Sequence, residues 1–343
     1  MIQYNNYSLK KHHTFGMDIK AHRFIEYETE EELVNVIDSL QKECAGLPWL
    51  HIGGGSNLLF VTDFYPGTIL HSTIRDLNIL KDTPTEIWLR AGAGIVWDEL
   101  VAYCIQRGWG GMENLSSIPG EVGASAVQNI GAYGVEVKDL IESVETIEVE
   151  TSTPRIFTNK ECNYAYRQSI FKKELKGKYI VTHVTYRLQK NPAFCLDYGN
   201  IRNELKKISQ PLSLTTVRQA IISIRDSKLP DPSVYGNAGS FFMNPIVPRD
   251  VLENIKKEYP DVPFYEVDET FVKIPAGWMI EKCGWKGRSL GNAAVHEKQA
   301  LVLINLGDAT GKEVVELSNK ICLSVKDKFG ITIHPEVNFI GDL

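Results

Sequence analysis

The sequence has 343 residues, of which 43% are hydrophobic and 23% charged, so it can bury a full core and form about two or three domains. Its net charge of −6 comes without any basic block, which argues against a nucleic-acid partner. No apolar run is long enough to span a membrane and the first residues lack the apolar segment of a signal peptide, so we expect a cytoplasmic protein without membrane insertion.

The cysteines and histidines give no sign of a disulfide framework or a metal site. A chain of this length needs no disulfide staples, and no C-x-x-C pair occurs, so we expect reduced thiols. The eight histidines show no ligand spacing, and HEKQA at His296 lacks the second histidine of a zinc helix. We therefore predict no bound metal. The six cysteines are Cys44, Cys104, Cys162, Cys195, Cys283 and Cys322.

The first two thirds of the chain mix short strands with amphipathic helices. Thr29 and Glu32 have the spacing of a capping box, and Gly46 follows, so the pattern predicts a helix over residues 29–43. Alternating apolar residues predict strands at 86–91, 143–150 and 179–188, and buried strands are expected at 48–52 and 57–61. Further helices are predicted at 97–108 and 215–227.

The last third follows LPDPS (229–233), whose two prolines end the preceding helix and mark a domain boundary. Helices are predicted at 249–258, 277–283 and 312–329, and strands at 271–276, 300–305 and 331–340. Because strands and helices follow no regular βαβα rhythm, the sequence indicates an α+β fold.

GGGSN, Gly53 to Asn57, is the first stretch that suggests ligand binding. Its glycines allow backbone N–H groups to converge into an anion nest for a pyrophosphate, although an ordinary glycine-rich turn fits the stretch equally well. No Rossmann fingerprint or P-loop occurs, because Trp97 replaces the third glycine of GAGIVW and no G-K-[ST] is present. A bound dinucleotide would therefore need another architecture.

A second glycine-rich stretch runs from Ile118 to Val137. It combines small residues with Ser125, Gln128 and Asn129, which favours backbone contact with a flat or extended ligand over close packing alone.

Three further residues are candidates for chemistry. Arg167 lies beside Tyr166 and could direct its guanidinium into a pocket or form a surface ion pair. Glu336 lies in a mostly apolar stretch, as a buried carboxylate or a solvent-facing one. Ser240 lies in GNAGSFFMNP, which fits a β-bulge or a serine delivered to a reacting carbon, but not a hydrolase elbow, because Ala238 replaces the first glycine.

Six separated motifs, taken in order, resemble the UDP-N-acetylenolpyruvoylglucosamine reductase family, flavoenzymes of bacterial cell-wall peptidoglycan synthesis. They are GGGSNLLF, IPGEVGASAVQNIGAYG, YAYRQSIFK, KLPDP with GNAGSFFMNP, IPAGWMIEKCGWKG and HPEVNFI. The similarity runs from about residue 15 to the end of the chain, and the Tyr198 segment resembles the longer subtype, in which a tyrosine loop covers the substrate. Met243 and Trp285 depart from the lysine and leucine that are common in relatives.

The resemblance implies an FAD-binding domain of the vanillyl-alcohol-oxidase type in two lobes, residues 1–70 and 71–228, and a substrate domain at 229–330. The segment 331–343 would pack back on the first lobe. It also implies non-covalent FAD, NADPH as reductant, UDP-N-acetylglucosamine enolpyruvate as substrate, and we expect a monomer.

The resemblance implies three sets of site residues. The catalytic positions are Arg167, Ser240 and Glu336. The FAD contacts are Gly53, Gly54, Gly55, Ser56, Asn57, Ile118, Ser125, Val127, Asn129 and Gly131. The substrate contacts are Tyr133, Tyr198, Lys228, Asn244 and Lys286.

Two alternative functions remain open from the residues. An oxidase of the same fold often binds flavin covalently through a histidine or cysteine near the glycine-rich turn, where this chain has Ser56 and Asn57. A non-catalytic sugar-nucleotide sensor would have no use for Arg167, Ser240 and Glu336 together. Turnover with NADPH would distinguish the reductase from both.

Overall fold

The computed structural model describes residues 1–43 and 46–342, and the chain forms two compact units. The first comprises Met1–Tyr7, Ala21–Gly54 and Pro66–Ser227, and the second Ser8–Lys20, Gly55–Tyr65 and Lys228–Leu343. Each unit is thus assembled from segments that are distant in the sequence. The three-domain division at residues 70 and 228 stays a prediction. Among the described residues no helix is long and apolar enough to cross a membrane.

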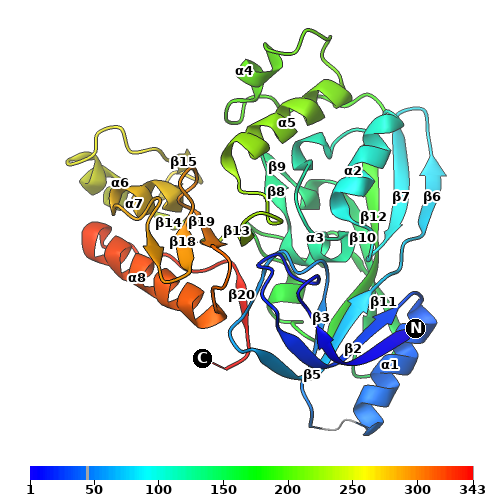
Figure 1. The fold of residues 1–343 in the computed structure, drawn as a ribbon. Helices are drawn as coiled ribbons and strands as arrows, with labels where there is room; N and C mark the ends of the chain where they lie inside the picture. The colour runs from blue at the N-terminus through cyan, green and yellow to red at the C-terminus, as the bar shows by residue number, and fades with distance from the viewer. Residues whose placement is uncertain (44–45, 343) are drawn as a thin grey trace. The chain divides into compact units, whose positions relative to one another are not determined.

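An antiparallel five-stranded sheet, in the order β11-β10-β12-β7-β6, is the centre of the first unit (Figure 1). A four-stranded sheet, β1-β2-β5-β3, carries α1, whose apolar face packs on Ile25, Tyr27 and Leu70. The strands are β1 (Ile2–Ser8), β2 (Lys20–Tyr27), β3 (Trp49–Ile52), β5 (Phe64–Ser72), β6 (Leu77–Asp82), β7 (Glu86–Gly92), β8 (Gly131–Ala132), β9 (Val135–Glu136), β10 (Ile141–Glu148), β11 (Pro154–Thr158) and β12 (Tyr179–Gln189). The helices are α1 (Glu30–Glu43), α2 (Trp97–Gln106), α3 (Val122–Gln128), α4 (Ile201–Leu205) and α5 (Leu214–Lys228), with the 3-10 turns η1 (Glu113–Leu115), η2 (Val137–Asp139) and η3 (Ile170–Lys172).

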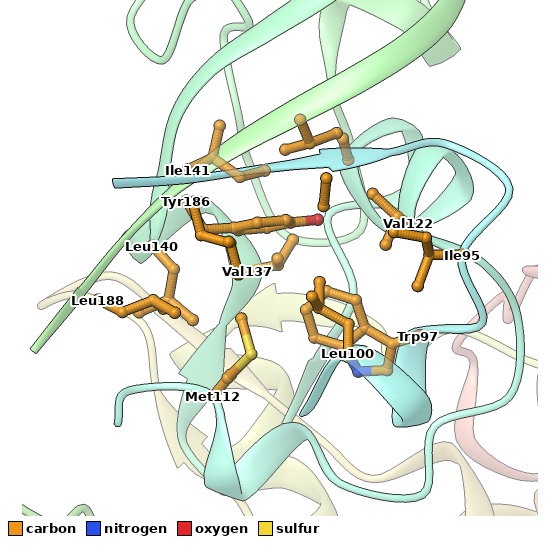
Figure 2. Packing of buried hydrophobic residues seen from close by; sticks show 14 of the residues in the cluster. Ile95, Trp97, Leu100, Met112, Val122, Val137, Leu140, Ile141, Tyr186 and Leu188 are labelled. Atoms are coloured by element: carbon orange, nitrogen blue, oxygen red, sulfur yellow. The ribbon is translucent and has the colours of Figure 1, made fainter. Parts of the chain in front are cut away.

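A large hydrophobic core of the first unit surrounds Tyr186 of β12 (Figure 2). The Trp97 ring of α2 meets Tyr186 edge-on, with 5.9 Å between ring centroids, and its indole N–H donates to the Leu115 carbonyl at 2.8 Å. The Tyr186 hydroxyl lies 3.1 Å from the Ser125 hydroxyl, so this polar group is satisfied although it is buried. The core therefore fixes α3, which carries part of the predicted cofactor site.

The second unit contains a four-stranded sheet, β13-β19-β18-β17, and a three-stranded sheet, β14-β16-β15. Its longest helix, α8, begins with a capping box between Thr310 and Glu313 and ends at the left-handed Gly330. The strands are β4 (Leu58–Phe60), β13 (Gly236–Ser240), β14 (Ile246–Pro248), β15 (Tyr265–Glu266), β16 (Phe271–Lys273), β17 (Ser289–Leu290), β18 (Ala293–Val295), β19 (Val302–Asn305) and β20 (Asn338–Ile340). The helices are α6 (Arg249–Lys256), α7 (Ala276–Lys282) and α8 (Gly311–Phe329).

The final strand differs from its prediction over residues 331–340. The ladder with β4 starts only at Asn338, so Glu336 precedes β20 instead of lying within it. Pro335 lacks a backbone N–H and makes only an isolated bridge with Phe242. The other strands and helices predicted from periodicity are present, with ends that differ by a few residues.

The described cysteines are all free, which confirms the expectation of reduced thiols for these five. They are Cys104, Cys162, Cys195, Cys283 and Cys322. Cys44 lies outside the described residues.

Candidate functional site

Two glycine-rich segments meet in the first unit. A methyl group on Gly54 would lie 3.3 Å from the Cα of Gly120, and one on Gly53 would lie 3.2 Å from a carboxylate oxygen of Glu121. Side chains at these positions would fill the space between the segments, so glycine leaves both backbones accessible. Gly53 and Gly54, the part of GGGSN that lies in the first unit, are thus neighbours of the Ile118–Val137 stretch.

Glu121 belongs to a row of three ionisable groups. His71 lies between Glu121 and Glu26, 2.9 Å from each carboxylate. Burial alone would lower the pKa of His71, but hydrogen bonds and charge attraction from both carboxylates raise it above its ordinary value. The imidazole therefore compensates negative charge beside the glycine-rich segments.

Asn129, directly after α3, joins three parts of the site. It is fully buried and left-handed, with φ 46°. Its amide donates to the Ala165 carbonyl at 2.8 Å, and its side-chain oxygen accepts from Lys138 N–H at 3.2 Å. Of the other predicted FAD contacts, Ile118 packs on the core, the Ser125 hydroxyl donates to the Val122 carbonyl, and the Val127 carbonyl accepts from Ser169.

Arg167 occupies a tight turn in which Ala165 and Gln168 exchange backbone hydrogen bonds of 3.0 and 2.9 Å. Its φ of 56° is left-handed, an uncommon conformation for a residue with a side chain. One guanidinium N–H donates to the Gly131 carbonyl at 2.9 Å. Strain of this kind is often found at functional sites, which supports a role for Arg167 beyond surface pairing.

Tyr133 is two residues after Gly131, whose carbonyl Arg167 bonds, and is also left-handed, with φ 49°. Burial raises the pKa of its hydroxyl, and Arg225 of α5 opposes this through charge attraction and a side-chain hydrogen bond. Burial in turn lowers the pKa of Arg225, and the positive charge of Arg167 acts in the same direction. Arg225 belongs to no sequence motif, and α5 brings it to this place.

Ser240 ends β13 in the second unit. The register of β13 on β19 shifts between Asn237 and Ser240, and Gly239 is left-handed with φ 66°, so the serine follows a β-bulge. Phe241 and Phe242 are buried beside it. The bulge interpretation of this stretch is therefore confirmed, and delivery of the serine to a reacting carbon stays a prediction.

Glu336 lies next to this bulge. Its backbone N–H donates to the Phe241 carbonyl at 2.8 Å, and its carbonyl accepts from the Asn57 amide at 3.3 Å. The structure thus brings Ser240, Glu336 and Asn57 together within one unit. Arg167 belongs to the first unit.

Three predicted substrate contacts lie in the second unit. Lys228 and Asn244 line a cavity of about 400 Å³ together with Trp278, Lys298 and Gln299. The Asn244 side-chain oxygen accepts from Ala276 N–H at 2.9 Å. Lys286 forms an ion pair of 3.1 Å with Glu281, which also lines the cavity.

Comparison with known proteins decides the family. The model described as "FAD binding domain" matches residues 21–154, and that described as "UDP-N-acetylenolpyruvoylglucosamine reductase, C-terminal domain" matches residues 231–340. A protein of that name from Bacteroides fragilis is 57% identical over 97% of this chain and 99% of its own length. One from Porphyromonas gingivalis is 45% identical over 98% of both chains. The chain belongs to the UDP-N-acetylenolpyruvoylglucosamine reductase family.

A solved structure supports the fold. The UDP-N-acetylenolpyruvylglucosamine reductase of Thermus caldophilus matches with a TM-score of 0.68 over 98% of both chains, at 22% identity. Members of the UDP-N-acetylenolpyruvoylglucosamine reductase family contain an FAD-binding domain, and this chain is accordingly an FAD-dependent oxidoreductase of α+β fold. The adjacent glycine-rich segments of the first unit fit such a cofactor.

A cluster of three side chains in the first unit places atoms that can bind a metal ion close together. Glu30, Glu145 and His183 place one such atom each within 4.8 Å of the others. Arg90 binds both oxygens of Glu145, and Asp76 lies 2.9 Å from His183, so these side chains form an ion-pair network. The absence of a metal site stays a prediction.

Proposed function

We propose that this enzyme reduces the enolpyruvyl group of UDP-N-acetylglucosamine enolpyruvate to UDP-N-acetylmuramate, with NADPH as reductant. The observation that carries the proposal is the bulge that delivers Ser240 beside Glu336, in a unit that also holds Lys228 and Asn244. The names of the relatives support the same substrate.

FAD held by the first unit would supply the hydride that reduces the enolpyruvyl group at C3. Negative charge then develops at C2 and on the adjacent carboxylate, where Arg167 stabilises it and Glu336 assists by hydrogen bonding. The Ser240 hydroxyl donates its proton to C2, which a serine can do against a carbanion in a dry site. Phe241 and Phe242, both buried, help to exclude water.

Anaerobic turnover tests the proposal. The purified protein should convert NADPH and UDP-N-acetylglucosamine enolpyruvate to NADP⁺ and UDP-N-acetylmuramate in a one-to-one ratio, followed by mass spectrometry. Acid denaturation should release FAD into the supernatant, because its binding is proposed to be non-covalent. A flavin that NADPH does not reduce, but that reacts rapidly with oxygen once it has been reduced chemically, would instead identify an oxidase.

A further inference from the structure

Asn114 is a buried polar residue whose side chain links two separate parts of the first unit. It is 1% exposed and lies in the short turn η1. Its amide donates to the Tyr133 carbonyl at 2.9 Å and to the Cys195 carbonyl at 2.8 Å. One side chain therefore fixes the distance between these two backbone segments.

The two segments also touch each other directly. The Cys195 thiol lies 3.8 Å from the Tyr133 carbonyl. A methyl group on Gly134 would lie 3.1 Å from the Cys195 sulfur and 3.4 Å from Cβ of Tyr198. The segment that carries Tyr198 is thus seated on the turn that carries Tyr133.

Residues 190–200 form no helix or strand, so side-chain contacts hold this segment in place. Phe194 and Leu196 pack toward α5, whereas Tyr198 is 38% exposed. The Asn114 oxygen, in contrast to its amide nitrogen, accepts no hydrogen bond from any described residue. A buried acceptor without a hydrogen bond lowers the stability of the fold. An asparagine at position 114 therefore needs an explanation other than stability.

We propose that Asn114 is a positioning residue for the sugar-nucleotide substrate. It holds Tyr133 and Tyr198 in a single arrangement before the substrate arrives, which reduces the ordering that binding requires. This inference rests on the proposed function, in which both tyrosines contact the substrate. Asn114 would act through the two tyrosine segments, because its amide is bonded to the Tyr133 and Cys195 carbonyls.

The chain offers a matched control in Asn159. Its side-chain amide also donates to two backbone carbonyls, those of Lys138 and Ile141, at 2.7 and 2.8 Å. Asn114→Ala and Asn159→Ala each remove two such bonds and should lower the Tm alike. Asn114→Ala should raise KM for UDP-N-acetylglucosamine enolpyruvate about tenfold with little change in kcat, whereas Asn159→Ala should leave KM unchanged.

A double-mutant cycle identifies the path of the effect. If Asn114 acts through Tyr198, the increases in KM caused by Asn114→Ala and Tyr198→Ala should be less than additive in free energy. Gly134→Ala, which forces Cys195 away from the turn, should raise KM even if Asn114→Ala does not fold. Equal KM effects of Asn114→Ala and Asn159→Ala, or fully additive effects with Tyr198→Ala, would overturn the proposal.

A proteolysis assay separates this inference from the proposed function. Chymotrypsin should cleave at Phe194 or Tyr198 about ten times faster in Asn114→Ala than in the wild type, since opening of a restrained segment controls its cleavage. An inactive wild type would refute the proposed function, and unchanged cleavage would refute the positioning role of Asn114.

Discussion

Ser240 is the residue whose role the structure makes most testable. Reduction of the flavin by NADPH needs no proton from serine, whereas reoxidation by the enolpyruvyl substrate needs one at C2. Ser240→Ala should therefore leave flavin reduction near the wild-type rate and slow reoxidation by about 10²-fold or more. Stopped-flow absorbance of the flavin band measures both half-reactions on one sample.

Two further variants serve as controls for that experiment. Ser240→Cys should keep part of the activity, because a thiol also donates a proton. Arg167→Ala should slow reoxidation through lost charge stabilisation, and cysteine at position 240 should not restore it. Reoxidation of Ser240→Ala at the wild-type rate would show that water or another residue protonates C2.

Lys228 lines the cavity of the second unit and is expected to bind the diphosphate of the substrate. Lys228→Ala should raise KM for the sugar nucleotide with only a modest loss of kcat. Lys257→Ala is the control, because the Lys257 side chain bonds Asn254. Steady-state kinetics compare the KM and kcat of the two variants. An unchanged KM in folded Lys228→Ala would remove Lys228 from the binding site.

At this scale the sequence predicted residues that belong to motifs and missed those that act through the fold. Ser240 and Glu336 are in motifs, and the backbone of Glu336 bonds Phe241, the residue after Ser240. Asn114 and Arg225 have no motif, because their importance comes from contacts with Tyr133, which lies far from Arg225 in the sequence. Only a three-dimensional structure reveals such contacts.

Among the elements, those with clear periodicity were predictable. The helix α8 has an apolar face and both terminal signals, and apolar and polar residues of β12 alternate from Val184 to Gln189. The strand β5 was not predicted, because it is buried over most of its length and shows no alternation. The predicted strand at 331–340 was too long, because its apolar pattern continues through Pro335, where pairing is interrupted.

His71 links elements of the first unit, since it joins Glu26 of β2 to Glu121 before α3. The pKa of His71 is higher in the folded protein than its ordinary value of about 6.5. Protonated His71 therefore stabilises the fold fully below about pH 6.5. This stabilisation is lost as the pH rises through the folded pKa. The free energy of unfolding should therefore fall as pH rises from about 6.5 through the folded pKa, by about 1.4 kcal/mol in all for each unit of the pKa increase.

Urea denaturation followed by circular dichroism at several pH values measures this slope. The variant His71→Gln keeps hydrogen-bonding capacity but has no titratable group at this position. Its free energy of unfolding should therefore lack the decrease with pH that is due to His71. His22→Gln changes an exposed histidine and should follow the wild type. Parallel pH profiles of His71→Gln and the wild type would exclude His71 as the source.

The whole molecule is divided in a way that the sequence does not indicate. LPDPS suggests that a separate domain follows it, yet the second unit also includes Ser8–Lys20 and Gly55–Tyr65. The strand β4 pairs with β20, Asn237 N–H donates to the Thr14 carbonyl at 3.0 Å, and the Asn305 amide donates to the Phe15 carbonyl at 3.1 Å. Hydrophobic periodicity describes neighbours along the chain and cannot reveal such pairings.

This arrangement predicts that residues 228–343 cannot fold alone. Phe15 and Phe60 are fully buried, and burial of each side chain contributes about 1.5–3 kcal/mol to stability. The fragment lacks both side chains and the pairing with β4. It therefore loses much of a free energy of unfolding that is typically about 5–15 kcal/mol. The isolated fragment should show no cooperative thermal transition by circular dichroism. A second fragment, in which flexible linkers attach residues 8–20 and 55–65 to 228–343, should recover the transition, because it restores both the ladder and the aromatic packing. A cooperative transition of the shorter fragment would mean that Ser8–Lys20 and Gly55–Tyr65 only cover a domain that is already complete.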